Sequence, residues 1–291
     1  MTSSNIHRKC LVCESERLNK LSKFKRTDLL QCKSCGFVFC EKIPTSKELA
    51  EYYSHYGLNQ YLSPITVKRY HEWLDHFEQF RRTGNILDVG CANGLFLTEA
   101  KKRGWNVYGT EYGDAQIKNG ESRGIIMKQG PLDEATFPNI QFDVITSIEV
   151  IEHINNPLEE IKHIHSMLRQ GGLFFCTTPN FNALSRYYLG DAYNIINYPE
   201  HLSYYTPKTI HRLLGNTFRK EKITTTGISI TRFNQSTGKK KQAVVSATSD
   251  DEMLRKKMDE KPLWKLAKSL LNALLNLTGL GYSLKVWYTK K

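Results

Sequence analysis

Long apolar segments are missing from this sequence, and acidic residues are scarce relative to basic ones. No run among the 291 residues is apolar over the length of a membrane-spanning helix, which argues against an integral membrane protein. Residues Met1–Cys10 contain no apolar core, so we expect no secretory signal peptide and a cytoplasmic protein. Internal repeats are also absent. A chain of this length is expected to form one α/β domain with a small appendage.

The shortage of acids leaves a strong positive charge. The chain has 29 acidic and 41 basic residues, which gives a formal net charge of +12. Such a charge favours acidic partners, namely sugar nucleotides, other phosphorylated substrates, nucleic acid or an anionic membrane surface. It does not select among them. Hydrophobic residues make up 40% of the chain, which is enough to form a core.

Four of the seven cysteines form two Cys-x-x-Cys pairs near the N-terminus. In a chain without an export signal, we expect such pairs to bind metal rather than to form disulfides. The pairs are 18 residues apart, a spacing typical of a structural zinc ion held by four thiolates. The predicted ligands are Cys10, Cys13, Cys32 and Cys35. We expect residues 1–43 to form a zinc ribbon, because this short basic segment needs the metal to fold.

Residues 85–111 are predicted to form a strand, a glycine-rich turn, a helix and a second strand that ends in an acid. The turn has the order Asp-x-Gly-x-Ala-x-Gly from Asp88 onward, and its small residues allow backbone N–H groups to approach a ligand. A dinucleotide fingerprint has a different order of glycines. A carboxylate at the end of the first strand would repel pyrophosphate but suits a cationic ligand. Glu111 lies where an acid binds ribose hydroxyls in nucleotide-binding βαβ units.

This arrangement resembles motif I of class I S-adenosylmethionine-dependent methyltransferases, and Glu111 matches their ribose-binding acid. The resemblance implies S-adenosylmethionine as the cofactor. It also implies cofactor contacts from the motif, from the second strand end, from a later loop that lies against adenine in related enzymes, and from the end of the fourth strand. The candidate residues are Asp88, Gly90, Cys91, Gly94, Glu111, Tyr112, Leu132 and Ile148.

Strands and helices alternate through the middle of the chain, which predicts a doubly wound parallel α/β sheet of the Rossmann-like methyltransferase type. Ligands then bind at the carboxyl ends of the strands. Residues 222–233 and 281–289 are predicted to form the antiparallel hairpin that ends the sheet in this superfamily.

The methyltransferase domain is expected to span residues 44–291, with a helical N-terminal extension and a C-terminal lid at about 234–280. The lid includes a leucine-rich helix, Leu263–Leu277, with lysines alongside. We favour packing of this helix against the body, because leucine covers nearly all of its faces. Contact with a membrane surface is the alternative.

Two polar clusters are candidates for the chemistry. The first, Glu149-Val-Ile-Glu152-His153, follows the predicted fourth strand and resembles a Glu-x-x-Glu-His element of ubiquinone-biosynthesis-type O-methyltransferases. In some of those enzymes the three side chains bind a divalent cation near the acceptor oxygen, so the resemblance implies such a cation here. The alternative is that these residues only shape the loop.

The second cluster is Tyr198-Pro-Glu200-His201, which precedes a capped helix. Histidine titrates near neutral pH and can take a proton from an acceptor hydroxyl. The cluster resembles a Tyr-x-Glu-His element of sugar C-methyltransferases, which also begin with a zinc-binding segment. This chain lacks room for their C-terminal sugar-binding domain, because only 90 residues follow His201.

The predicted catalytic residues are therefore His201 and His153 as competing bases, with Glu200 or Glu152 orienting them and Tyr198 nearby. The predicted function is methyl transfer from S-adenosylmethionine to an oxygen of a small, anionic acceptor such as a sugar nucleotide or saccharide, with polysaccharide biosynthesis as a setting. An RNA-modifying methyltransferase is the second hypothesis, since zinc segments precede this fold in some of those enzymes and the charge suits a phosphate backbone. A non-catalytic module that binds the cofactor or a partner is the third.

Overall fold

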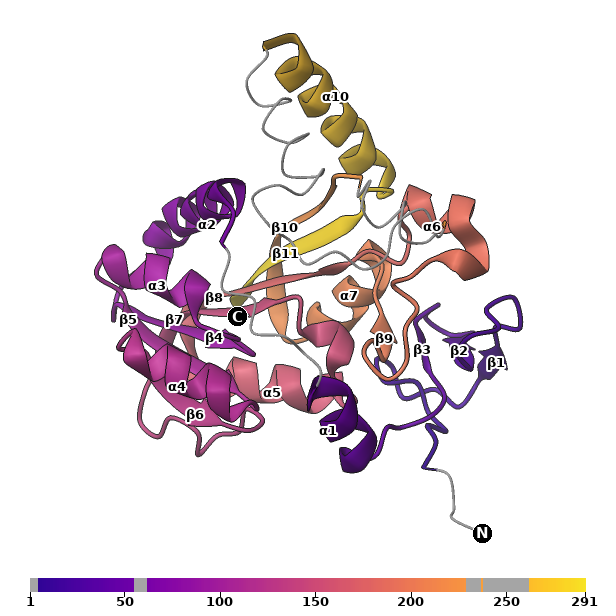
Figure 1. Ribbon diagram of the computed structural model, residues 1–291, viewed down its shortest axis with the longest axis horizontal. Coiled ribbons are helices and arrows are strands. Elements are labelled where there is room, and N and C mark those ends of the chain that lie inside the picture. The colour runs from indigo at the N-terminus through magenta and orange to yellow at the C-terminus, as the bar shows by residue number, and fades with distance from the viewer. Residues whose placement is uncertain (1–4, 55–61, 229–236, 238–261) are drawn as a thin grey trace.

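The computed structural model describes residues 5–54, 62–228, 237 and 262–291 (Figure 1). Its centre is a seven-stranded sheet with the order β10-β11-β8-β7-β4-β5-β6. The strands are β4 (Asn85–Val89), β5 (Asn106–Glu111), β6 (Ile126–Gln129), β7 (Phe142–Ile148), β8 (Leu168–Pro179), β10 (Phe218–Thr226) and β11 (Ser283–Lys290). Strands β8, β7, β4, β5 and β6 run parallel, and β11 pairs antiparallel with both β8 and β10. The predicted Rossmann-like sheet with its closing antiparallel hairpin is confirmed.

The central strands β4, β7 and β8 are buried on both faces, as parallel strands are when helices cover both sides, whereas the edge strands β6 and β10 are largely exposed. Along β4, Ile86 points to one apolar cluster, and Leu87 and Val89 point to the other. Strand β8 alternates in the same way, with Phe174 on the second side and Phe175 on the first. This alternation follows from the two-residue period of a strand.

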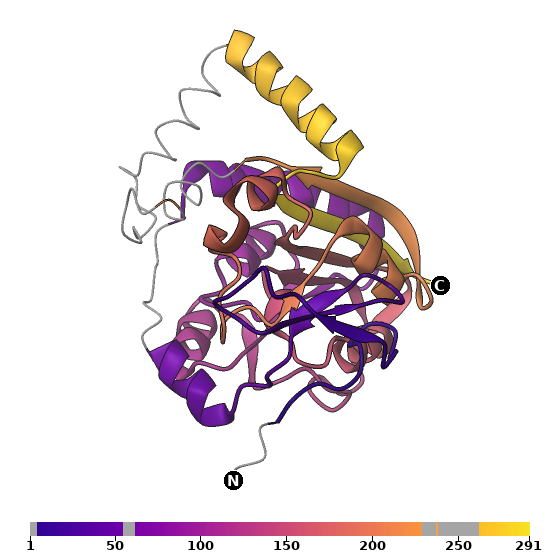
Figure 2. The same cartoon turned by 90° about the vertical axis from the view of Figure 1, so that its right-hand side faces the viewer.

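Helices cover the two faces in separate layers (Figures 1 and 2). One face carries α2 (Pro64–Phe77), the short η1 (Glu78–Phe80), α3 (Leu95–Lys102) and α4 (Asp114–Ser122). The other carries α5 (Pro157–Met167) and α7 (Pro207–Leu214). Helix α7 begins at a capping box, in which the Thr206 hydroxyl accepts from the Thr209 backbone N–H and Pro207 occupies the first turn.

A second, four-stranded sheet has the order β1-β2-β3-β9. Its first three strands come from the N-terminal segment: β1 (Leu18–Lys20), β2 (Leu29–Cys32) and β3 (Val38–Cys40). The fourth, β9 (Ser203–Tyr204), lies after the central parallel strands and pairs antiparallel with β3. The N-terminal segment therefore shares a sheet with the methyltransferase part of the chain. The proposed division at residue 43 stays a prediction.

The remaining elements lie beyond the carboxyl ends of the strands or outside the two layers. They are α1 (Ser46–Ser54), η2 (Ile151–His153), α6 (Leu184–Leu189), η3 (Gly190–Ala192) and α10 (Pro262–Thr278). Most of the expected lid, residues 238–261, lies outside the described residues. Within the described part of the chain, no helix combines the length and the apolarity needed to cross a bilayer.

The prediction that the C-terminal helix packs against the body is wrong. Seven large apolar side chains of α10 are between 42% and 86% exposed, and Leu275 is the helix's buried apolar contact. Leucine on nearly all faces shows that a helix is apolar, but the sequence does not show whether the body offers a surface to cover it.

Candidate functional site

The glycine-rich turn after β4 is held in a conformation that needs small residues. Gly90, Ala92 and Gly94 all have positive φ, at +64°, +47° and +69°. A Cβ atom on Gly90 would lie 2.8 Å from Val150 Cγ2, and one on Gly94 would lie 2.3 Å from Ile125 Cδ1. The turn therefore packs tightly on its neighbours, and small residues let its backbone lie close to the place a ligand would take.

Glu111 joins this turn to the end of β5. Its Oε2 accepts from the Ala92 backbone N–H at 2.8 Å, and its Oε1 accepts from the Tyr112 backbone N–H at 2.8 Å. A carboxylate offers about four lone-pair sites, so two remain for hydroxyl donors. This donor set fits a ribose diol. The fit supports the predicted placement of Glu111.

Asp88 is the buried acid of the site, with 4% of its surface exposed. The Thr146 hydroxyl on the adjacent β7 donates to Asp88 Oδ1 at 2.6 Å. Burial raises the pKa of Asp88 to about 7, and the nearby Glu111 carboxylate also raises it, while Thr146 opposes the shift. A cationic neighbour favours the ionised form of such a carboxyl group and would therefore lower its pKa.

The other predicted cofactor residues surround this turn in different ways. Cys91 is buried, and its backbone N–H donates to the Thr110 carbonyl, so its thiol faces the core. Tyr112 is 65% exposed and Ile148 is partly buried at the end of β7. The Leu132 side chain is buried in the core, and its carbonyl bonds His163 Nδ1 at 2.8 Å.

The segment after β7 leads from the cofactor turn to the polar clusters. Val150 contacts Gly90, and η2 begins at the next residue. Glu149 adopts a positive φ of +56°, which is rare for a residue with a side chain and marks local strain. Its Oε1 accepts from the Thr177 hydroxyl at 2.8 Å. The clusters are thus placed beside the turn at the carboxyl edge of the sheet.

Glu152 and His153 lie in η2 and face the second cluster. Glu152 is 3% exposed, and its Oε2 accepts from the Thr178 hydroxyl at 2.9 Å. Burial and then the Glu149 charge hold the pKa of Glu152 well above its usual value. Burial lowers the pKa of His153, so its imidazole is neutral at neutral pH.

The two candidate bases form a pair. The His153 and His201 rings lie with centroids 5.0 Å apart. Nδ1 of His153 bonds the Glu200 carbonyl at 2.6 Å, and Nδ1 of His201 bonds the Ile195 carbonyl at 2.7 Å. A nitrogen that bonds a carbonyl carries the proton, so Nδ1 is the protonated nitrogen of each neutral ring. Glu200 thus orients His153 through its backbone, and its carboxylate points elsewhere.

The three side chains that come within metal-ligand range are Glu152, His153 and His201, whose ligand atoms lie within 4.8 Å of one another. The resemblance had implied Glu149 in place of His201. In the structure Glu149 is exposed and bonds Thr177. The set of ligands that the sequence implied, with Glu149, therefore differs from the set that the fold brings together, with His201.

Tyr198 and the Glu200 side chain face the N-terminal elements. The Tyr198 ring lies under Lys42 Nζ at 5.2 Å. Glu200 Oε2 accepts from the Tyr52 hydroxyl at 2.8 Å and from Asn197 Nδ2 at 2.7 Å. Tyr52 was not a predicted site residue. It is 148 positions from Glu200, and no local pattern could have related the two.

Lys285 is a second residue that the sequence analysis missed. It lies on β11 opposite Thr177, the residue that bonds Glu149, and its Nζ donates to the Thr226 hydroxyl at 2.9 Å. Burial lowers the pKa of Lys285 to about 8. Lys285 lies two positions before Trp287, so in a strand both side chains point to the same face of the sheet. This spacing was the sequence signal for a lysine on a face that carries buried residues.

The four N-terminal cysteines meet as predicted. Their sulfur atoms lie within 4.8 Å of one another, with Cys10–Cys35 and Cys13–Cys32 separations of 3.5 and 3.6 Å. In a tetrahedral zinc site with Zn–S bonds of about 2.3 Å, neighbouring sulfurs lie about 3.8 Å apart. Burial raises the pKa of the Cys32 thiol, but backbone N–H groups of Cys35 and Ser34 lower it to a net value of about 6. The donor set therefore fits zinc.

This segment also supports the His201 cluster. The Cys40 backbone N–H donates to the Leu202 carbonyl at 2.8 Å, and the Cys40 thiol contacts the His201 carbonyl at 3.4 Å. Phe37 packs on Tyr205 with ring centroids 5.0 Å apart. The N-terminal segment thus contacts the chain on both sides of β9, at Leu202 before the strand and at Tyr205 after it, directly after His201.

Comparison with known proteins agrees with this geometry. A sequence profile of the family described as "Methyltransferase domain" matches residues 65–217, more than half of the chain. The chain belongs to this family, and it is a class I S-adenosylmethionine-dependent methyltransferase by sequence and fold. The profile does not include the cysteine segment.

Two curated relatives of this methyltransferase are named ubiquinone biosynthesis O-methyltransferase. The protein from Acinetobacter baumannii is 29% identical over 121 residues, which cover 39% of this chain and 51% of the relative. The protein from Pseudomonas aeruginosa is 32% identical over 133 residues, which cover 42% and 53%. The chain spans about half the length of the curated relatives it matches.

Among solved structures, a SAM-dependent methyltransferase from Archaeoglobus fulgidus superimposes with a TM-score of 0.53 and 17% identity. The match covers 84% of this chain and all of that one. At this identity the likeness shows the fold.

Proposed function

We propose that this methyltransferase transfers a methyl group from S-adenosylmethionine to an oxygen atom of a small acceptor. The observation that supports the proposal is the close packing of Val150 beside Gly90, because Val150 lies three residues before His153, whose ring is 5.0 Å from that of His201. When bound, S-adenosylmethionine supplies a methyl group on a positively charged sulfur.

The chain's own residues divide the work between the two sides of this contact. Glu111 would hold the ribose, the small residues of the turn would let the cofactor approach the backbone, and Asp88 would balance its positive charge. On the other side, the neighbouring imidazoles of His153 and His201 are the titratable bases that would take a proton from a hydroxyl. We propose His201 as the base, with His153 as the competing candidate and Glu152 and Glu200 positioning them.

Two observations support an acceptor oxygen on a small, anionic molecule. The chain carries a net charge of +12, and the half-buried Lys285 adds a cation near Glu149 at the carboxyl edge of the sheet. A sugar nucleotide or saccharide fits this charge and the Tyr-Pro-Glu-His resemblance. That resemblance is the sole basis for proposing a role in polysaccharide biosynthesis. An intermediate of ubiquinone biosynthesis is the second candidate acceptor, because the curated relatives carry that name.

Turnover of purified protein on sugar nucleotides, saccharides, ubiquinone-pathway phenols and RNA tests the proposal. With the acceptor found, His201→Ala is expected to lose at least about 10²-fold in kcat while cofactor affinity holds, since a positioned base contributes about 10²–10⁴-fold. His153→Ala should be milder. His165→Ala on α5 is the matched control and should turn over normally. Turnover on RNA alone would support the second hypothesis, and cofactor binding without turnover on any acceptor would support the binding module.

A divalent cation at the Glu152, His153 and His201 cluster would give a different outcome. Added Mg²⁺ or Mn²⁺ would then stimulate turnover, and Glu152→Gln would match His153→Ala in severity. Glu149→Gln distinguishes a cation held by Glu152, His153 and His201 from a cation held by the Glu149, Glu152 and His153 set that the resemblance implied. We expect it to have little effect, because Glu149 bonds Thr177 and lies outside the cluster.

A further inference from the structure

Helix α10 exposes an apolar face that is large for a water-soluble protein. Its exposed large apolar side chains are Leu263, Trp264, Leu266, Leu270, Leu271, Leu274 and Leu277. Their spacing of three and four residues places most of them along one broad stripe. The helix projects away from the central sheet in both views (Figures 1 and 2).

The polar side of α10, rather than its apolar side, attaches the helix to the body. Asn272 Oδ1 accepts from the Gly227 backbone N–H at 2.9 Å, and Asn276 Oδ1 accepts from the Thr225 backbone N–H at 3.0 Å. These asparagines are one helical turn apart, so both lie on the same side of the helix. A helix on the surface of a globular protein normally shows the reverse arrangement, with its apolar side inward. The arrangement suits an apolar environment outside the protein.

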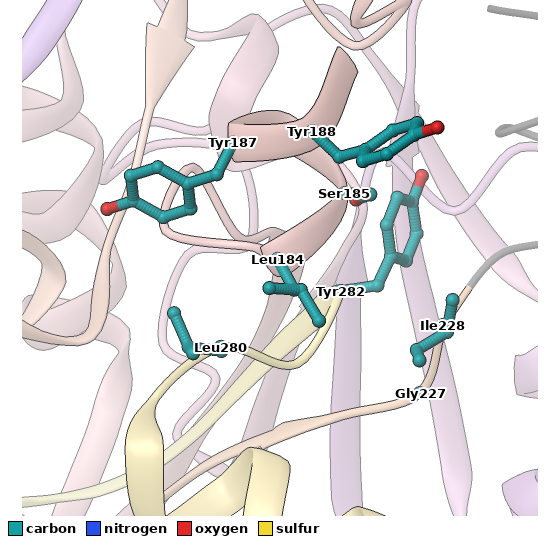
Figure 3. Close-up of a pocket in the computed structure, with 8 residues that line it drawn as sticks. All are labelled: Leu184, Ser185, Tyr187, Tyr188, Gly227, Ile228, Leu280 and Tyr282. Atoms are coloured by element: carbon teal, nitrogen blue, oxygen red, sulfur yellow. The ribbon is translucent and has the colours of Figure 1, made fainter. Parts of the chain in front are cut away.

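A second apolar surface lies at the foot of α10. A cavity of about 450 Å³ is lined by residues of α6, of the segment that follows β10 and of the segment that precedes β11. Figure 3 shows Tyr188, Tyr282 and Ile228 on one side of it and Leu280 on the other. Tyr187 and Tyr188 are 58% and 76% exposed. Tyrosine and tryptophan side chains favour the boundary between water and lipid, because one end of each is apolar and the other polar.

The charge of this part of the chain points to the nature of the partner. Helix α10 itself carries two lysines, Lys265 and Lys268, and no aspartate or glutamate. A second copy of the chain seated on α10 would bring like charges together, with no acid on the helix to neutralise them. An anionic lipid surface attracts the lysines and accepts the leucines.

We propose that α10, together with the exposed tyrosines of α6, docks this methyltransferase on the surface of an anionic lipid bilayer. The leucine stripe enters the boundary of the acyl chains, and Lys265 and Lys268, in the projecting part of the helix N-terminal to the two asparagines, extend past the stripe to the headgroups. The polar side with Asn272 and Asn276 stays on the protein. The carboxyl edge of the central sheet, where the cofactor turn lies, is then held near the lipid surface.

Vesicle co-sedimentation tests this proposal. The full chain is mixed with vesicles of phosphatidylcholine alone or with phosphatidylglycerol added. We expect at least about tenfold more bound protein on the anionic vesicles, with loss of binding at high salt, because lysines near an anionic surface each add affinity that salt screens. The fluorescence of Trp264 should shift to the blue on binding, and this shift should be missing in Trp264→Phe.

Leu266→Ser/Leu270→Ser/Leu274→Ser should abolish binding. Since all three side chains are exposed, the variant should keep its circular dichroism and its cofactor-induced thermal shift. Ile126→Ser on β6 is the control, because Ile126 is 52% exposed at the opposite edge of the sheet. Equal binding to neutral and anionic vesicles, or binding to neither, overturns the proposal. A dimer in solution that the triple variant abolishes also overturns it, and assigns the face to a second copy.

Discussion

At the scale of single residues, the buried Asp88 makes cofactor affinity depend on pH. The pKa of Asp88 is raised from 3.8 to about 7, so much of this group is protonated in the ligand-free protein at pH 6. A cationic ligand stabilises the carboxylate and lowers its pKa. Binding below pH 7 therefore releases a proton, and affinity should rise with pH by up to about tenfold per unit until it levels off near pH 8.

Calorimetry with S-adenosylhomocysteine, which keeps the ammonium group, measures both the affinity and the proton release in buffers of different ionisation enthalpy. Asp88→Asn should bind more weakly and lose most of the pH dependence. Burial lowers the pKa of His153, the other ionisable candidate of the site, so His153→Ala is the control and should keep the slope. Tyr70 and Cys91, which also lie near Asp88, have pKa values raised by burial and do not titrate there. A flat profile in the unaltered protein would contradict the assignment of Asp88.

Gly90 provides a steric prediction at the same scale. Gly90→Ala places a Cβ atom 2.8 Å from Val150 and keeps a positive φ that alanine disfavours. Val150 or the turn must move, so we expect cofactor affinity to fall by at least about tenfold, the effect of about 1.4 kcal/mol. Gly171→Ala has a similar φ of +70° but meets only the Arg169 side chain at 3.7 Å. It should lower stability slightly and leave affinity unchanged, which separates steric displacement from backbone strain.

These residues also show what the sequence could and could not predict about the site. The turn and Glu111 were visible because a βαβ unit fixes their separation along the chain. The cluster of Glu152, His153 and His201 was only partly visible, because it joins segments separated by about 50 positions through the fold. The sequence placed Glu149 in the metal group by its neighbours in the string, while its side chain turns to Thr177.

At the scale of elements, the pairing of β3 with β9 links the zinc segment to the candidate base. If Cys13→Ser/Cys32→Ser removes the metal, we expect β3 to lose its support and the backbone around His201 and Leu202 to loosen. Among the residues that the structure describes, no hydrogen bond joins the turn after β4 to this segment, so kcat should fall while cofactor affinity changes little. Metal analysis of the unaltered protein should show one zinc per chain.

Hydrogen exchange provides the local measurement for this prediction. The amides of Cys40 and Leu202 should exchange faster in the double variant, and those of β4 should not. Zinc is also expected to restore the slow exchange in protein whose metal has been removed by a chelator. A metal-free protein with unchanged kcat would show that the segment does not support the base.

Helix α10 shows the limit of sequence patterns for elements. The pattern predicted a helix over Leu263–Leu277, and the structure has α10 at Pro262–Thr278. What the pattern could not reveal is that Asn272 and Asn276 cap two backbone N–H groups of the strand end, which turns the leucine stripe outward. The orientation of an amphipathic helix depends on the surface beneath it, and that surface comes from elements far away in the sequence.

At the scale of the whole molecule, the central sheet could be predicted because alternating strands and helices allow few topologies. The association of the N-terminal segment with this sheet could not, because it depends on pairing between strands more than 160 positions apart. One apolar cluster contains the four-cysteine segment's Phe37 and Phe39 together with Leu87 of β4 and Tyr288 of β11. The two parts thus share a core as well as a sheet.

A shared core predicts a single cooperative unfolding transition. Because Phe37 packs on the fully buried Tyr205, loss of the N-terminal segment exposes apolar surface on the remaining chain. In differential scanning calorimetry we expect one transition for the zinc-loaded protein, with a calorimetric enthalpy equal to the van't Hoff enthalpy. Zinc removal should lower the Tm of this whole transition, and S-adenosylhomocysteine should raise it, since a ligand that binds only the folded state stabilises it.

The fragment 44–291 distinguishes a shared core from two independent domains. With a shared core, this fragment should be less stable than the full chain, with a lower Tm and increased binding of a hydrophobic dye, since Tyr205 and its neighbours lose the cover of Phe37 and Phe39. A matched fragment, 5–291, removes only residues before the first described one and should unfold like the full chain. Two separate transitions, or a fragment 44–291 with the Tm of the full chain, would show that the cysteine segment is a domain of its own.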